Sequence, residues 1–215
     1  MTGLESWRRM WRELGAPAGD EGLHQRLLDA WSEPQRHYHT LQHLNECLSQ
    51  FAPVRHLGRH PAEVELALWF HDAFYEPRRH DNEERSAAWA VEATASAGVA
   101  PEVGRRVSGL VMLTCGHEPP TDVDGQLLVD VDLSILGAER ERFDESDEQI
   151  RREYAHVPDA DFRTGRSKIL AAFLARPRLY CTGHFHALLE ARARDNLRHS
   201  LDKLAAKGGP LPCDG

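Results

Sequence analysis

Residues 67–75 read Ala-Leu-Trp-Phe-His-Asp-Ala-Phe-Tyr, and this stretch organises every expectation for the rest of the chain. His71 and Asp72 stand side by side in an otherwise apolar helical stretch that runs from about Val64. Burying a carboxylate is costly unless a positive group meets it, and neither Lys nor Arg lies between Val64 and Tyr75. A metal ion bound to both side chains would neutralise Asp72, so the stretch predicts a metal site.

Composition limits the class of protein. The chain has 215 residues, of which 41% are hydrophobic and 28% charged, which predicts one globular domain over residues 1–207 and a flexible tail over 208–215. A net charge of -8 argues against a nucleic-acid duplex as partner. Four cysteines without a CxxC pair suit a reducing cytoplasm, and no apolar run is long enough to span a membrane. Nothing in the sequence indicates the oligomeric state.

Apolar residues recur at helical spacing along most of the chain, and no strand-like alternation of useful length appears, so the expected fold is all-α. Arg192 and Asn196 are polar residues on the last helix that we expect to hydrogen-bond in the core. The expected helices are Leu4–Leu14, Leu23–Trp31, Arg36–Phe51, Pro61–Tyr75 with Pro61 in its first turn, Asn82–Ala97, Glu102–Cys115, Gln126–Leu136, Glu139–Tyr154, Asp161–Leu174 and His184–Ala206.

Two further histidines lie four residues apart, at His39 and His43. On one helix this spacing places both imidazoles on the same face, where they can enter one pocket. A histidine-rich helix surface is the simpler interpretation of this pair alone. Together with His71 and Asp72 on another helix, the pattern favours a shared metal site.

The stretch Leu127 to Gly137 supplies further carboxylates, Asp130 and Asp132, inside another apolar helix. Burying either carboxylate carries the same cost as burying Asp72 unless a positive group neutralises it. For Asp130, a helix cap or a pair with an arginine is an equally good explanation. For Asp132 we favour metal binding.

The order His43, His71-Asp72, Asp132 resembles the H…HD…D signature of the HD superfamily of metal-dependent phosphohydrolases, over roughly residues 36–137. Tyr38-His39-x-x-x-His43 and Asp132-Leu-Ser look like the matching stretches of cyclic-nucleotide phosphodiesterases. The motifs Trp-Phe-His-Asp-Ala-x-Tyr and Asn82-Glu-Glu-x-Ser-Ala87 are similar to a bacterial group of predicted HD phosphohydrolases. The chain is short and has no evident nucleotide-clamping glutamine region, so the resemblance does not imply cyclic-nucleotide activity.

The resemblance implies a helical bundle of the HD type and hydrolysis of a phosphate ester, with a nucleotide as one option for the substrate. His43, His71, Asp72 and Asp132 would bind a divalent Mn, Fe, Co, Ni or Zn ion, with Mg a further option. Such an ion makes bound water acidic and neutralises phosphoryl oxygens. Asp72 would also orient the water, and His39 would be the general acid.

Several other residues have more than one open interpretation. His117 follows Thr114-Cys-Gly and is either a second-site metal ligand, a phosphate contact or a plain loop histidine. Glu84 fits a capping box with Asp81, although Glu83 or Glu84 could instead contact metal-bound water. Candidate contacts to a substrate phosphate, with a solvated surface as the alternative, are Arg78, Arg79, Arg166 and Lys168.

Two other classes of function stay open. The first is a non-catalytic, regulatory HD module in which the metal is a structural element or a sensor. The second is an HD-type oxygenase with two iron ions and more histidine and aspartate ligands. Metal stoichiometry and phosphatase activity would separate these classes from a phosphohydrolase.

Overall fold

The described part of the chain, residues 3–16 and 20–206 of this computed structural model, forms ten α-helices and short 3-10 segments, with no strand. The all-α prediction is confirmed. The chain divides into two compact units, Met1–Asp132 and Leu133–Gly215. Residues 208–215, for which we expected a flexible tail, lie outside the described residues.

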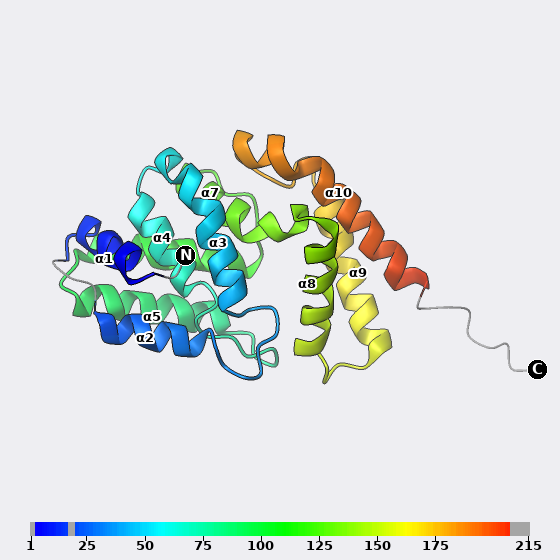
Figure 1. The fold of residues 1–215 in the computed structure, drawn as a ribbon, viewed down its shortest axis with the longest axis horizontal. Coiled ribbons are helices and arrows are strands. Elements are labelled where there is room, and N and C mark those ends of the chain that lie inside the picture. The colour runs from blue at the N-terminus through cyan, green and yellow to red at the C-terminus, as the bar shows by residue number, and fades with distance from the viewer. Residues whose placement is uncertain (1–2, 17–19, 207–215) are drawn as a thin grey trace, which may run out of the picture. The chain divides into compact units, whose positions relative to one another are not determined.

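The first unit is built around α4 (Pro61–Phe70), where every residue from Ala62 to Phe70 is buried. A helix that is buried on all sides is expected at the centre of a bundle. Pro61 occupies the first turn, where its missing N–H costs nothing. The helices that pack against α4 in Figure 1 are α1 (Leu4–Glu13), α3 (Leu41–Val54), α5 (Asn82–Ser96), α6 (Pro101–Met112) and α7 (Val123–Asp132).

The remaining elements of this unit are short. α2 (Glu21–Ala30) packs on α1, and Asp20 caps it by accepting a hydrogen bond from the Gly22 amide at 2.8 Å. The 3-10 segments η1 (Arg55–Leu57) and η2 (Leu113–Cys115) extend α3 and α6. Among the described residues, no helix is both long enough and apolar enough to cross a bilayer.

Two buried acids on α4 show how this protein normally neutralises a carboxylate. The Arg106 guanidinium makes two hydrogen bonds to Glu63, at 2.7 and 2.6 Å. Glu65 accepts from Arg9 at 2.9 Å and from Arg55 at 3.0 Å. Paired, hydrogen-bonded charges of this kind are the usual condition for burying an acid.

Three local predictions are wrong. α3 begins at Leu41, after the Thr40 hydroxyl accepts from the Gln42 amide, so His39 precedes the helix and does not share its face with His43. α4 ends at Phe70, so His71 and Asp72 lie at its C-terminal end and not inside it. Asp81 forms no capping box, because its carboxylate pairs with Arg79 at 2.6 Å instead.

The second unit consists of η3 (Leu133–Gly137), α8 (Arg140–Glu153), α9 (Asp159–Ala175) and α10 (Gly183–Ala206). The Asn196 amide donates to the carbonyls of Leu136 and Ala138, and Arg192 donates to that of Gly137. These bonds satisfy the carbonyls that η3 leaves at its end, as helix termini require. Asn196 hydrogen-bonds in the core as expected, whereas the Arg192 side chain is 41% exposed and makes its bonds at the surface.

Candidate metal centre

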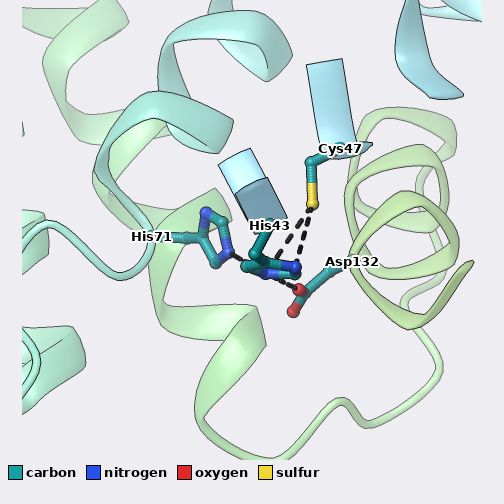
Figure 2. Close-up of side chains that lie close together, drawn as sticks. All are labelled: His43, Cys47, His71 and Asp132. Atoms are coloured by element: carbon teal, nitrogen blue, oxygen red, sulfur yellow. Dashed lines mark hydrogen bonds and ion pairs between the residues drawn. The ribbon is translucent and has the colours of Figure 1, made fainter. Parts of the chain in front are cut away.

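Three helices of the first unit bring the predicted ligands together. His43 comes from the first turn of α3, His71 directly follows α4, and Asp132 ends α7. Figure 2 shows their side chains pointing toward one another, with Cys47 beside them. His43, Cys47, His71 and Asp132 each offer one ligand atom, and these atoms lie within 4.8 Å of one another.

The distances fit a single cation. His43 Nε2 lies 3.2 Å from His71 Nε2 and 3.1 Å from Asp132 Oδ1. His71 Nε2 lies 3.5 Å from Asp132 Oδ1 and 3.2 Å from Asp72 Oδ2. Ligand atoms that each lie about 2.1 Å from one ion are separated by roughly 3–3.5 Å, so this spacing suits a shared metal.

The tautomer of His71 also suits a metal ligand. Its Nδ1 lies 2.8 Å from the Leu68 carbonyl oxygen, which can only accept, so Nδ1 carries the hydrogen. Nε2 then faces the cluster, ready to offer its lone pair. An imidazole fixed through its other nitrogen is the usual arrangement around protein-bound metals.

The cluster carboxylates have no arginine or lysine partner. Within residues 3–16 and 20–206, the ion pairs of Asp72 and Asp132 are all to histidines. Glu63 and Glu65, on the neighbouring α4, are paired with arginines. A bound cation would therefore neutralise two carboxylates that have no arginine or lysine beside them among the described residues.

The charges of the cluster shift its pKa values strongly. Burial by itself would raise the pKa of Asp72, but the nearby charges of His71 and His39 lower it below the ordinary value. Burial likewise opposes a charged His71, and the Asp72 and Asp132 carboxylates outweigh it and raise the pKa of His71. The two carboxylates therefore favour a positive charge at this position.

The rim of the cluster carries two more histidines. His39 Nε2 lies 3.9 Å from Asp72 Oδ2, and its ring stacks on Tyr75 with centroids 3.9 Å apart. His117 Nε2 lies 2.7 Å from Asp132 Oδ2. His117 has a φ of 50°, the only positive φ of a non-glycine residue in the described chain, and such strain often accompanies functional sites.

The loop from Phe74 to Asn82 is fixed to α5. Asn82 accepts from the Glu76 amide and donates to the Glu76 carbonyl, at 3.2 and 3.0 Å. The Ser86 hydroxyl accepts from the Phe74 amide at 3.0 Å. The conspicuous polar residues of the segment 82–87 therefore hold the chain that follows Asp72.

The other candidate residues are spread over both units. Glu83 and Glu84 lie in the first turn of α5, and Arg78 and Arg79 are exposed on the preceding loop. Arg166 and Lys168 lie on α9 of the second unit, where Arg166 pairs with Asp147 at 2.8 Å.

Sequence reasoning missed two residues of the centre. Cys47 follows His43 by four residues on α3, so helical spacing alone could have placed it there. Arg36 is the second: its buried guanidinium donates to the Asp72 carbonyl at 2.6 Å and the Ala73 carbonyl at 2.8 Å. No sequence signal links Arg36 to residues 36 positions away.

These observations define an all-helical protein with a buried cluster of metal-ligand side chains. No family model, no curated protein and no solved structure matches the chain.

Proposed function

We propose that this protein is a metal-dependent phosphohydrolase of the HD type, which binds one divalent transition metal through His43, His71, Asp72 and Asp132. The observation that carries the proposal is the pair of clustered carboxylates, Asp72 and Asp132, whose ion-pair partners among the described residues are all histidines. Two imidazoles and two carboxylates suit Mn, Fe, Co, Ni or Zn. When bound, the metal would activate water and stabilise charge on a phosphoryl oxygen.

The protein side chains around the cluster supply proton transfer. Asp72 is partly accessible and faces both the cluster and His39, so it can orient the attacking water. His39 is held at 3.9 Å from Asp72 and is accessible enough to meet a substrate, which suits a general acid. In hydrolysis the water oxygen would bond to phosphorus and give a proton to Asp72, the ester P–O bond would break, and the proton of His39 would go to the leaving oxygen.

The substrate is a small phosphate ester or nucleotide in this proposal. Arg78 is exposed on the loop after Asp72 and is the basic side chain we assign to a substrate phosphate. Arg79 is already engaged by Asp81, which makes it the weaker candidate. Glu83 and Glu84 begin α5 at the end of the same loop, where they would adjust the charge near water.

The test combines elemental analysis with phosphatase assays on untagged protein purified without chelator. We expect about one transition metal per chain, and a loss of metal and of hydrolysis by more than about 100-fold in His71→Ala, since even outer-shell changes cost 10–100-fold. His56→Ala removes an exposed histidine of the same unit and is the matched control. Full metal retention in His71→Ala would refute the ligand assignment, and a metal-loaded protein without activity on any phosphate ester would refute the hydrolase.

Cys47 supports a second candidate, a non-catalytic module with a structural metal. If the ion takes His43, Cys47, His71 and Asp132, four protein ligands close the coordination sphere, as in structural zinc sites. Burial first, and then Asp132 and Asp72, raise the pKa of the Cys47 thiol, so the thiolate needs a bound cation. Cobalt-loaded protein decides the matter: a thiolate-to-cobalt charge-transfer band that Cys47→Ser removes favours the structural site.

A further inference from the structure

The second unit contains a cavity that the metal chemistry does not use. Its volume is about 410 Å³, and its walls come from the last part of α8, the first part of α9 and the last two turns of α10. Cavities of this size hold small molecules. In Figure 1, α8 and α9 run side by side in the C-terminal half of the chain.

Basic side chains dominate the wall. Five of them line the cavity against three acids, Asp147, Glu148 and Asp159. This local excess of positive charge stands in a chain whose net charge is -8. The five basic side chains are Arg151, Arg152, Arg163, Arg166 and Lys203.

Two of the three acids are already committed to fixed partners. Asp147 accepts from Arg166 at 2.8 Å and from the Ser200 hydroxyl. Asp159 accepts from Arg151 at 2.6 Å. The third, Glu148, is exposed and can turn to solvent. The ion pairs of Asp147 and Asp159 hold the guanidinium groups of Arg166 and Arg151 in place. The lining still has more basic than acidic side chains.

Several donors of the wall have no acceptor in the described chain. Arg163 is half-buried and makes no ion pair or hydrogen bond with any described residue. The Nε of Arg166 is buried and has no acceptor there either, although its Nη2 binds Asp147. A buried N–H without a partner costs about 1–3 kcal/mol, so a bound acceptor would stabilise this arrangement.

The cavity also has an apolar side. Phe162 lines it together with Leu204, and the Arg151 guanidinium lies 4.7 Å from the centre of the Phe162 ring. Arginine forks match the geometry of phosphate oxygens better than ammonium groups do. An aromatic ring next to such forks suits the organic part of a phosphorylated molecule.

We propose that this cavity binds a small phosphorylated metabolite, with Arg163 and Arg166 holding the phosphate and Phe162 contacting the organic part. The observations favour a small ligand over a nucleic acid, because the basic groups gather around one cavity and do not form an extended surface stripe. The site lies wholly within the second unit and goes beyond the proposed hydrolysis, so it stands whether or not the metal centre is catalytic.

The test is calorimetric titration of the full-length protein, as purified, with pyrophosphate, ribose 5-phosphate, ADP and citrate. We expect at least one phosphorylated probe to bind with a Kd below about 1 mM. Arg163→Gln should weaken this binding by at least about tenfold, which corresponds to one lost charged contact of about 1.4 kcal/mol. Arg178→Gln, an exposed arginine of the same unit outside the cavity, is the matched control and should bind normally.

Asp72→Asn separates this site from the metal centre. Binding that Asp72→Asn retains and Arg163→Gln loses supports the proposal, and tighter binding of ADP than of pyrophosphate supports a contribution of the organic part to the affinity. Three results would overturn it: no phosphorylated probe binds, Arg163→Gln binds as well as wild type, or citrate binds as tightly as the phosphates. Loss of binding in Asp72→Asn alone places the ligand at the metal centre and also overturns the proposal.

Discussion

Replacing Arg36 by lysine tests how the His71-Asp72 segment is held in place. The Arg36 side chain is 0% exposed, and it donates to the carbonyls of Asp72, Ala73 and His39 and to the Glu33 carboxylate. An ammonium group has its three donors on one atom, so it cannot reach carbonyls that lie in different directions.

The expected cost follows from the bonds that lysine cannot make. Hydrogen bonds to a charged group contribute about 1.5–3 kcal/mol each, and the loss of two, with partial relaxation, predicts destabilisation by roughly 2–4 kcal/mol. This is a large part of a typical unfolding free energy of about 5–15 kcal/mol. Since Arg36 fixes the backbone of Asp72, the variant should also bind metal about 10–100-fold more weakly, as loss of an outer-shell partner does.

Urea unfolding followed by tryptophan fluorescence measures this effect. All five tryptophans lie between Trp7 and Trp89, so the signal reports the first unit. Chelator in every sample removes the contribution of metal binding to stability. With an m value of about 1–3 kcal/mol/M, the midpoint should fall by roughly 1–2 M.

Arg12→Lys is the matched control, because Arg12 is exposed and bonds only to the Arg8 carbonyl of its own helix. Its midpoint should stay close to that of the wild type. If Arg36→Lys unfolds at the wild-type urea concentration, the guanidinium does not hold the segment and the reasoning from its four partners fails.

Three further substitutions test other parts of the structure. Burial would raise the pKa of Glu190, but hydrogen bonds from two backbone amides and an arginine outweigh it and lower that pKa. The ionised carboxylate therefore stabilises the fold at pH values above its unfolded pKa of about 4.3. This stabilisation is lost as the pH falls below that value and through the lower pKa of the folded state. Glu190→Gln should therefore lower the stability by about 1–3 kcal/mol at pH 7. In circular dichroism melts, the difference in stability between the variant and the wild type should disappear below about pH 4. A difference that does not depend on pH would contradict the lowered pKa of Glu190. Trp31→Phe removes the 3.0 Å bond to the Trp69 carbonyl and should cost about 1–3 kcal/mol in urea titrations, whereas an unchanged midpoint would show that water replaces the bond. Gly137→Ala places a methyl group 2.6 Å from the Leu189 Cβ and 3.1 Å from the Leu189 carbonyl oxygen. Overpacking of this kind should lower the stability by about 1–3 kcal/mol. If the variant melts at the wild-type temperature, α10 moves away from the methyl group without cost and the argument fails.

The sequence by itself determined the helical class and the position of most helices. Apolar residues at helical spacing, Pro61 in a first turn and Gly98 after α5 are local signals, and local interactions set most helix boundaries. The chemical argument about Asp72 was also available in advance, because the absence of a nearby basic residue in sequence is visible without coordinates.

Local signals failed at the start of α3. His39 was expected on the face of a helix, but Thr40 caps α3 and leaves His39 in the preceding turn. The ring centres of His39 and His43 are still 5.9 Å apart, so the two side chains are neighbours as predicted, although they do not share a helix face. Helix ends are decided by small energies such as one cap, which periodicity does not report.

Only the tertiary structure showed which charges are neutralised by protein and which are left for a ligand. From the sequence alone, Glu63 needs a neutralising partner as much as Asp72 does. In the structure Arg106, 43 residues away, hydrogen-bonds to the Glu63 carboxylate and neutralises it. Arg36 contacts the segment that contains Asp72, but its guanidinium donates to the Asp72 backbone carbonyl and not to the Asp72 carboxylate. The ion-pair partners of that carboxylate are histidines. Such pairings depend on which helix faces touch after packing, and a long-range contact of this kind leaves no periodic trace in the chain.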